Sequence, residues 1–372
     1  MNVRTHSREH VGNFAAAAGA RVVLLAVLLL LAGLTTACAP GTHLAYVSQP
    51  TTNGVAAYRI RNVNNAFTAI VGSPYLAGNS PGPIVVSPST KFLYVGNRID
   101  NTISLFKIDG QIGSLTEVLP RTATGLDPAA MAMNASGTLL FVVNQIGSSI
   151  SVYSVNAANG ALTRVAGTPV PTTLNPVTLA VTPSGKFLYV VNTNLGAVFG
   201  YSISSSGALQ LIPGSPFAAD VGAFALAIDP KEKFVYVANT TANTVSIFSI
   251  AATGALAQVA GSPFATGTTP ISVAVSNGGQ YLYIANEASN NITEYSIDAT
   301  TGFATTISGS PISAGTQPLL LSVDPDGFYL YVVSQSSKTI TSYSIPASTG
   351  ELTSTGQSTT TSDTVAGIAV SH

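Results

Sequence analysis

The stretch that decides the fold runs from Asp229 to Pro263 and reads DPKEKFVYVANTTANTVSIFSIAATGALAQVAGSP. Two strands are predicted within it, at residues 233–239 (KFVYVAN) and 244–250 (TVSIFSI), because β-branched and aromatic residues dominate both segments. Residues 234–237 are apolar on both faces, which is typical of a strand buried on two sides. Asn and Gly fill the turns, and a third, weaker strand is predicted to end at the GSP of residues 261–263.

This pattern recurs throughout the chain. One aromatic residue marks the first strand of each copy, at intervals of 47 or 48 residues: Tyr46, Tyr94, Phe141, Tyr189, Tyr236, Tyr283 and Tyr331. An independent marker in the following strand keeps the same spacing: Tyr58, Phe106, Tyr153, Tyr201, Phe248, Tyr295 and Tyr343. A fixed period in this range, with several short strands per unit, is typical of a β-propeller. We therefore predict an all-β fold, a seven-bladed β-propeller of four-stranded antiparallel blades.

The two ends of the chain are predicted to share one blade. Six copies are preceded by a strand of small and branched residues, suited to the crowded propeller axis: 84–87, 130–133, 178–181, 225–228, 272–275 and 319–323. The first copy, at residues 44–48, has no such strand before it, but residues 365–370 (VAGIAV) have this character. We therefore expect the C-terminal strand to pair into the N-terminal blade. This closure would remove the sheet edges that an open array exposes.

The N-terminal 37 residues read as a targeting segment. Basic residues precede an apolar run at 22–34 that is too short to span a bilayer comfortably, and the run leads into LTTAC at 34–38. Small residues before the lone Cys38 resemble the lipobox of bacterial lipoprotein signals, in which the cysteine is acylated. This resemblance implies a lipid on Cys38 that attaches the protein to a membrane of the bacterial cell envelope. Ordinary signal cleavage nearby and a retained membrane anchor are the alternatives.

The predicted domain organisation follows from these two features. Residues 1–37 form the signal peptide, residues 38–42 a short anchor linker, and residues 43–372 a single propeller domain, which we expect to be monomeric. Only 8% of residues are charged and 46% are hydrophobic, which excludes ordinary disorder. Lys and Arg number 14 against 15 Asp and Glu, so there is no basic excess to indicate a nucleic-acid partner.

The topology of a blade assigns its loops to two faces. The loops between successive blades and the turns between second and third strands share one face, named here the crossover face. The other turns share the opposite face, where the chain enters the domain, named here the N-terminal face. A lipid on Cys38 would hold the N-terminal face toward the membrane and present the crossover face outward. A ligand or partner is expected on the crossover face, since function concentrates in loops on a rigid scaffold.

Few ionisable residues lie on the crossover face. Three precede inner strands, near the expected mouth of the channel: Asp127, Asp220 and Asp363. Four lie further out, in turns: Arg98, Asp100, Glu287 and Lys338. The aspartates are either loop anchors or an acidic ligand or cation site. The asparagines that end the second strands are predicted to cap tight turns: Asn97, Asn144, Asn192, Asn239 and Asn286.

Metal and cofactor sites are not expected. Ring closure would bring His43 and His372 together on the N-terminal face, but two histidines lack the further ligands of a usual zinc site. The sequence also contains no Cys/His cluster, no Gly-rich phosphate loop and no nucleophile elbow. We therefore predict neither a metal nor a cofactor.

Residues 42–372 resemble the seven-bladed lactonase-like propellers, which include the propeller type of 6-phosphogluconolactonase, and the related Tyr-Val-Thr-Asn repeat proteins. The motifs that carry the resemblance are DPKEKFVYVAN at 229–239, TPSGKFLYVVN at 182–192, IDATTG at 297–302 and GSPF at 261–264. The resemblance implies hydrolysis of a lactone. Lactone-active members typically place a histidine after the proline that opens an inner strand, and this chain has Ala129, Val177, Ile271 and Leu319 there.

Two functions remain open. The first is a lipid-anchored scaffold that binds a protein, glycan or small ligand on the crossover face, where Asp220, Asp363, Asp100 and Lys338 are further candidate contacts. The alternative is a lactone hydrolase. Such an enzyme needs a base to activate water and a cation or N–H donors for the developing oxyanion. Glu287 or Asp127 as the base and Arg98 as the electrophile are the predicted catalytic residues.

Overall fold

The structure is a computed structural model and describes residues 42–61, 64–173 and 175–371. The predicted signal peptide and Cys38 lie outside these residues. Within the described ranges, no helix is long and apolar enough to cross a membrane.

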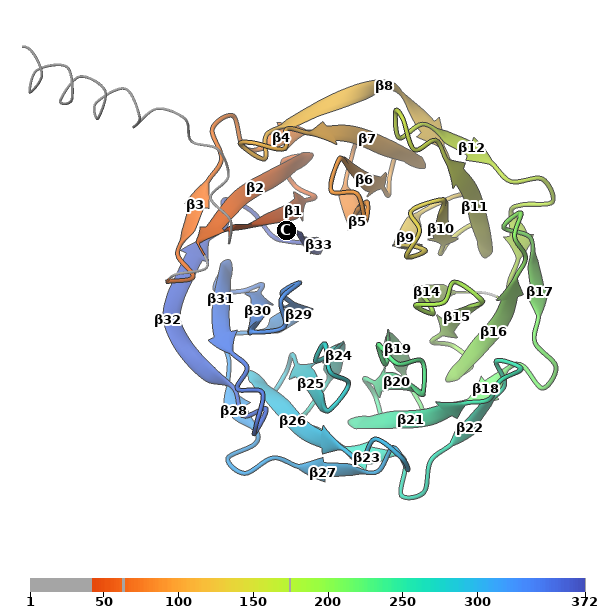
Figure 1. Cartoon of the computed structure of the whole chain (residues 1–372), viewed down its shortest axis with the longest axis vertical. Helices are drawn as coiled ribbons and strands as arrows, with labels where there is room; N and C mark the ends of the chain where they lie inside the picture. Colours follow the sequence, from red (N-terminus) through yellow and green to blue (C-terminus); the bar gives the residue numbers. More distant parts are fainter. Residues whose placement is uncertain (1–41, 62–63, 174, 372) are drawn as a thin grey trace, which may run out of the picture. The chain divides into compact units, whose positions relative to one another are not determined.

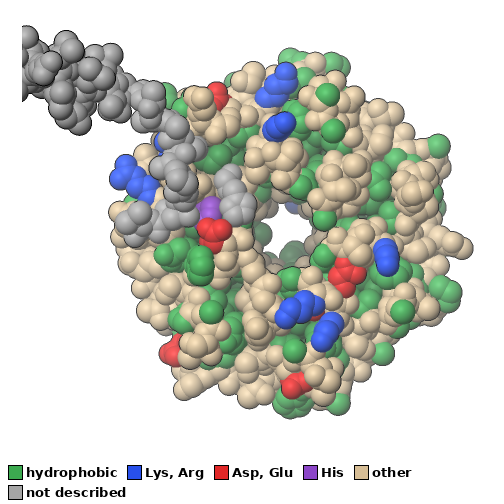
Figure 2. Space-filling view, in the orientation of Figure 1, with side chains coloured by type: hydrophobic (Ala, Val, Ile, Leu, Met, Phe, Trp, Pro, Cys, Tyr) green, Lys and Arg blue, Asp and Glu red, His purple; other side chains and the backbone are tan. Residues whose placement is uncertain are grey.

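Seven antiparallel sheets surround a central channel (Figure 1), and the opening remains when all atoms are drawn (Figure 2). The innermost strands are β33 (Gly367–Ser371), β5 (Pro81–Val86), β9 (Pro128–Met133), β14 (Pro176–Val181), β19 (Ala223–Ile228), β24 (Pro270–Val275) and β29 (Pro318–Val323). The second strands are β1 (Thr42–Gln49), β6 (Phe92–Asn97), β10 (Leu139–Asn144), β15 (Phe187–Asn192), β20 (Phe234–Asn239), β25 (Tyr281–Asn286) and β30 (Tyr329–Ser334). This confirms the predicted seven-bladed propeller.

The outer half of each blade is built from the third and fourth strands. The third strands are β2 (Gly54–Arg61), β7 (Thr102–Ile108), β11 (Ser149–Val155), β16 (Ala197–Ile203), β21 (Thr244–Ile250), β26 (Asn291–Ile297) and β31 (Thr339–Ser344). The outer strands β8 (Leu115–Ala123) and β32 (Thr353–Thr360) are single. The other outer strands are divided in two: β3 (Phe67–Ala69) and β4 (Tyr75–Leu76), β12 (Leu162–Arg164) and β13 (Val170–Pro171), β17 (Leu209–Leu211) and β18 (Phe217–Ala218), β22 (Leu256–Gln258) and β23 (Phe264–Ala265), β27 (Ala304–Thr306) and β28 (Ile312–Ser313).

The division of the outer strands corrects the prediction that GSP ends them. Residues 261–263 lie between β22 and β23, and both of these strands pair with β21. The hydroxyl of Ser262 accepts a hydrogen bond of 2.9 Å from the backbone N–H of Ile247 in β21. The serine thus replaces a ladder partner where the outer strand bulges away, because an unpaired N–H there would be costly. The motif therefore interrupts the outer strand and does not end it.

The C-terminal strand closes the ring as predicted. Strand β33 pairs antiparallel with β1, from Leu44 opposite Ser371 to Ser48 opposite Gly367. The N-terminal blade therefore takes its inner strand from the opposite end of the chain. Its hydrophobic cluster joins Ala45 and Val47 of β1 to Ile368 and to Tyr331 of the preceding blade. The core of the molecule consists of such layers between adjacent blades.

The aromatic markers also connect blades by hydrogen bonds. Each of four marker hydroxyls donates to the carbonyl of a glycine in the next blade: Tyr46 to Gly113 (2.9 Å), Tyr94 to Gly160, Tyr189 to Gly254 and Tyr283 to Gly350 (2.8 Å each). Gly350 has φ +68°, and a Cβ there would lie 2.2 Å from the ring of Tyr281. Only glycine fits this turn. Tyr331 donates instead to Oδ1 of Asn65 (3.1 Å), whereas the buried hydroxyl of Tyr236 has no hydrogen-bond partner among the described residues.

This difference gives a matched pair of variants. Tyr283→Phe should lower the free energy of unfolding by about 1–2 kcal/mol, because the buried carbonyl of Gly350 loses its donor. Tyr236→Phe should leave it unchanged or raise it slightly, because it removes a hydroxyl that is already unpaired. Urea denaturation of both variants beside the parent protein measures the difference. Equal losses in the two variants would contradict a structural role for the inter-blade hydrogen bond.

Candidate functional site

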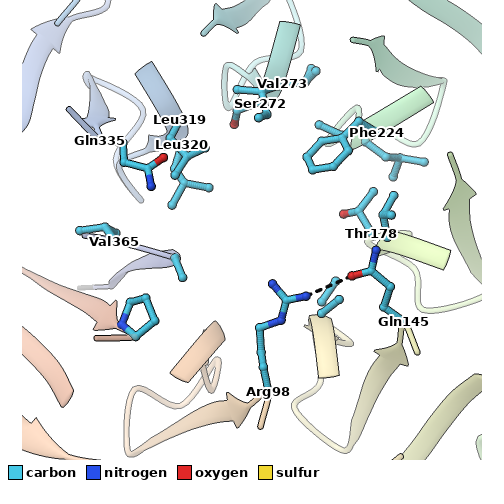
Figure 3. Close-up of a pocket in the computed structure, with 18 of the residues that line it drawn as sticks. Arg98, Gln145, Thr178, Phe224, Ser272, Val273, Leu319, Leu320, Gln335 and Val365 are labelled. Carbon is cyan, nitrogen blue, oxygen red and sulfur yellow. Dashed lines mark hydrogen bonds between the residues drawn. The ribbon is translucent and has the colours of Figure 1, made fainter. Parts of the chain in front are cut away.

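A cavity of about 450 Å³ opens at the channel mouth on the crossover face. The starts of five inner strands and the segment before β33 contribute mostly aliphatic side chains, among them Val177, Ile271 and Leu319, together with Phe224. Arg98, Gln145 and Gln335 add the longer polar side chains. Figure 3 shows Arg98, Phe224 and Gln335 pointing into the same space from different blades. Arg98 is the only charged residue that lines this cavity among those described.

The repeat itself brings the polar residues to the mouth. Arg98, Gln145 and Gln335 each follow the residue that ends a second strand, in the turn to the third strand. Asn97, which precedes Arg98, is buried and accepts a 3.0 Å hydrogen bond from the N–H of Gly78. Its amide nitrogen also donates to Thr102 and Ser104. The asparagine therefore fixes both the turn and the neighbouring crossover loop, in line with its predicted capping role.

Arg98 is held by two neighbouring side chains. Its Nε donates to Oδ1 of Asp127 (2.6 Å), and its Nη2 donates to Oδ2 of Asp127 (2.9 Å) and to Oε1 of Gln145 (3.1 Å). Nη1 forms no hydrogen bond to any described residue. The hydrogen bonds with Asp127 raise the pKa of Arg98 and outweigh the opposing effect of burial. The result is an oriented cation whose remaining N–H donors are available to a ligand.

Asp127 is positioned by the crossover loop. It has a left-handed backbone with φ 58° and is followed by Pro128. Its N–H donates to Oδ1 of Asn101 (2.8 Å), and its carbonyl accepts from the N–H of Gln145 (2.8 Å). Gln145 in turn donates to Oδ1 of Asn175 (2.6 Å). The Arg98–Asp127 pair is therefore part of a polar network that spans three blades and restricts the movement of both side chains.

A second cavity of about 430 Å³ lies beside the first and shares Arg98 with it. Its lining includes Asp127 and three apolar side chains that are largely exposed, Ile99, Leu126 and Ile146. Arg98 thus contributes to both cavities, while Asp127 faces the outer one. A bound molecule could contact the cation in one cavity while water reaches the carboxylate from the other.

The other predicted site residues are placed differently. Glu287 follows Asn286 at the repeat position of Arg98, but it lines neither of these cavities. Asp100 accepts hydrogen bonds from the backbone and side chain of Asn79, and Asp220 accepts from Thr244. Asp363 accepts from the N–H groups of Thr52 and Thr364. Lys338 is exposed and also outside both cavities. The three aspartates therefore act as loop anchors.

Two residues were missed from the sequence. Gln145 bridges Arg98 to the next blade, and its signal is its repeat position, one residue after Asn144. Glu294 is fully buried in β26, at a repeat position that is occupied elsewhere by residues such as Val152 and Ile247. Its Oε1 accepts a 2.8 Å hydrogen bond from the N–H of Leu352 in the next blade, and its Oε2 has no partner among the described residues. Burial raises the pKa of Glu294 to about 7.

Glu294 should make stability depend on pH. Its pKa in the unfolded chain is near 4.5, so the folded state binds more protons between that value and about 7. Stability then falls as pH rises through this window, by up to about 3 kcal/mol. Glu294→Gln should remove this slope. The melting temperature of the variant minus that of the parent protein should therefore increase by about 3–5 °C from pH 5 to pH 8. Exposed Glu351→Gln is the control and should retain most of the slope, because Glu351 makes only the smallest contribution to the raised pKa of Glu294. Parallel curves for parent and Glu294→Gln would contradict the expected titration.

The comparisons with known proteins agree with this fold. The family model described as lactonase, 7-bladed β-propeller matches residues 36–175, 179–313 and 273–368. A candidate 6-phosphogluconolactonase from Bacteroides fragilis is 22% identical, with a TM-score of 0.77 over 90% of this chain and 99% of that one. The periplasmic gluconolactonase of Pseudomonas aeruginosa is 18% identical, with a TM-score of 0.75 over 89% of this chain and 99% of that one. No curated protein sequence matches significantly.

At these identities the solved structures establish the fold alone. The family model covers most of the chain, including the loops that carry Arg98, Asp127 and Gln145. The chain therefore belongs to the family of seven-bladed β-propeller lactonases.

Proposed function

We propose that this protein binds a small lactone at the channel mouth and hydrolyses it. The observation that carries the proposal is the guanidinium of Arg98, which Asp127 and Gln145 hold so that Nη1 remains available at a largely apolar cavity. Donors fixed before the reaction stabilise developing charge without reorganisation at the moment of reaction. Membership of the lactonase family supports the same chemistry.

The proposed reaction uses the two cavities together. The lactone carbonyl oxygen accepts a hydrogen bond from Nη1 of Arg98. A water molecule adds to the carbonyl carbon and transfers a proton to the carboxylate of Asp127, whose oxygens retain accepting capacity beyond the bonds from Arg98. The negative charge on the carbonyl oxygen is stabilised by Arg98. Cleavage of the ring C–O bond then releases a hydroxy acid, with the proton from Asp127 returning to the leaving oxygen.

The charge of the site favours a lactone without a phosphate. Arg98 is already neutralised by Asp127, and no second cation lines either cavity among the described residues. A phosphate group would bring about two negative charges at neutral pH and is normally held by several Arg or Lys side chains or backbone donors. Aliphatic walls and the ring of Phe224 are suited to an uncharged substrate with apolar parts.

Binding without hydrolysis is the second candidate function. One observation in its favour is that aliphatic residues occupy the inner-strand positions where lactone-active relatives typically have a histidine. Another is that both carboxylate oxygens of Asp127 already accept hydrogen bonds from Arg98. A pH-stat assay of the purified protein with uncharged aliphatic and sugar lactones separates the two functions. We expect turnover that Arg98→Ala strongly reduces. Binding of a lactone without turnover would replace the enzyme with a ligand-binding module, and absence of both would remove the channel mouth as the site.

We also propose that the protein is lipid-anchored in the bacterial cell envelope through Cys38, as the lipobox resemblance implies. Strand β1 begins at Thr42 on the N-terminal face, beside Ser371 of β33. An anchor four residues earlier would therefore leave the channel mouth facing away from the membrane. The mass of the N-terminal peptide, compared between the parent protein and Cys38→Ser, tests this proposal. An unmodified cysteine, or cleavage elsewhere, would reject it.

A further inference from the structure

Three potential metal ligands, His43, Asp324 and Asp326, meet on the N-terminal face, where the last blade contacts the first. Nε2 of His43, in β1, lies 3.1 Å from Oδ2 of Asp326, and Nδ1 lies 3.8 Å from Oδ2 of Asp324. One potential ligand atom from each residue lies within 4.8 Å of the other two. His43 and Asp324 are 3% and 1% exposed, whereas the side chain of Asp326 is 36% exposed. Figure 2 shows the histidine, in purple, beside acidic side chains near the channel.

The structural role of Asp324 accounts for only one of its oxygens. Oδ1 accepts a 2.6 Å hydrogen bond from the N–H of Tyr329, which closes the turn between β29 and β30. In other blades a single hydroxyl, from Ser87, Thr182 or Ser276, accepts the equivalent backbone hydrogen bond and closes the turn. Oδ2 of Asp324 is therefore not needed for the turn. It is buried without a hydrogen-bond partner, a costly arrangement for a carboxylate oxygen.

The two neighbours also depart from the repeat. His43 occupies the position of Lys91, Lys186 and Lys233, which precede the second strands of other blades. Asp326 occupies the position of Ser89, Ser136 and Ser184. Nothing in the propeller repeat requires an imidazole and a second carboxylate at these places. Because both side chains lie next to a buried carboxylate oxygen without a hydrogen-bond partner, they point to a bound cation.

The donor set indicates which cation. An imidazole nitrogen with two carboxylate oxygens suits first-row transition ions such as Zn²⁺ and Mn²⁺, whereas Ca²⁺ and Mg²⁺ are bound through oxygen ligands. Ligand distances of about 2.0–2.2 Å place neighbouring donors roughly 3–4 Å apart, so small side-chain rotations would bring all three onto one ion. Three protein ligands leave at least one position for water.

We propose that His43, Asp324 and Asp326 form a binding site for a divalent first-row transition ion that joins the first and last blades. The ion would link residues that are 283 positions apart in sequence, close to the pairing of β33 with β1. The unfolded chain does not hold these residues together, so binding stabilises the folded ring. This site lies on the face opposite the channel mouth and does not depend on the proposed lactone chemistry.

The test uses the full-length protein, purified without a histidine tag and stripped with a chelator. Addition of Zn²⁺ or Mn²⁺ at 100 times its dissociation constant should raise the melting temperature by about 4 °C. Equilibrium dialysis should give one ion per chain. Asp326→Asn, at the most exposed of the three positions, should abolish both effects. Asp229→Asn is the matched control, because Asp229 closes the equivalent turn in another blade by accepting from Lys233, and this variant should bind like the parent protein.

Three outcomes would overturn the proposal. Absence of stoichiometric binding in the parent protein at millimolar ion would leave His43 as an ion-pair partner of the two aspartates only. Equal loss of binding in Asp229→Asn would show that the effect is general destabilisation. A melting shift with Ca²⁺ but not with Zn²⁺ or Mn²⁺ would exclude histidine as the deciding ligand.

Discussion

Deletion of residues 364–372 should destabilise the whole ring and sharply lower its melting temperature. The deletion removes β33, whose five residues pair with β1, and leaves the edge of β1 open to the channel. It also removes Val365, Ile368 and Val370 from the cluster between the first and last blades. Full burial of such a side chain contributes about 1.5–3 kcal/mol; Val365 is buried and the other two are partly buried, so together they contribute several of the 5–15 kcal/mol by which a domain is usually stable.

Thermal unfolding followed by circular dichroism measures this prediction. The parent protein should melt in one transition, and the truncated protein should either melt at a much lower temperature or aggregate through its open edge. A synthetic peptide of residues 364–372 is the control, because it should restore part of the transition when added to the truncated protein. An unchanged melting curve after truncation would mean that the ring does not depend on closure by the C-terminal strand.

The second large effect is expected at Arg98. Arg98→Ala should lower kcat/KM for a lactone by about 10²–10³-fold, since it removes the donor that faces the developing oxyanion. Arg98→Lys should recover little of this, because an ammonium cannot donate to Asp127 and Gln145 in the same fork geometry. Initial rates over a range of substrate concentrations separate kcat from KM. A kcat/KM for Arg98→Ala within a factor of two of the parent value would exclude Arg98 from the reaction.

Two carboxylate variants identify the base. Asp127→Asn should lower kcat with little change in KM, because it removes proton transfer and keeps a side chain of the same size next to Arg98. Glu287→Gln should leave both constants unchanged, because Glu287 lines neither cavity. A large loss in Glu287→Gln with normal activity in Asp127→Asn would reverse the assignment, in favour of the other base that the sequence predicted. Melting temperatures of all variants control for loss of fold.

The architecture was predictable because every blade repeats the same pattern of strand residues. Packing between blades demands an aromatic residue at the same depth in each second strand, so positions such as Tyr94 and Tyr236 recur at a constant interval. The missing inner strand of the first copy and the spare strand at residues 365–370 predicted ring closure by the same logic. Averaging over seven copies suppresses the errors that a single strand prediction would carry. The division of the outer strands was missed because a bulge repaired by a serine hydroxyl has the composition of a turn.

The candidate site was only half predictable for the opposite reason. Topology placed Arg98, Asp127 and Glu287 on the crossover face, but it does not say which side chains meet across blades. The turn geometry of two different blades brings the guanidinium of Arg98 onto the carboxylate of Asp127, 29 residues away. Glu287 has the repeat position of Arg98, yet it lines neither cavity. Sequence position sets the face, and local hydrogen bonds set the direction of each side chain.

By itself, the sequence determined the number of blades, the strands that build them, the closure of the ring and the face on which to look for a ligand. These properties depend on periodic burial of apolar residues, and the spacing of those residues along the sequence shows this period directly. The tertiary structure alone decided the pairing of Arg98 with Asp127, the burial of the Glu294 carboxyl group and the approach of His43 to Asp324. Those contacts join residues from different blades, and none repeats around the ring. Their energies depend on ångström distances that no periodicity encodes.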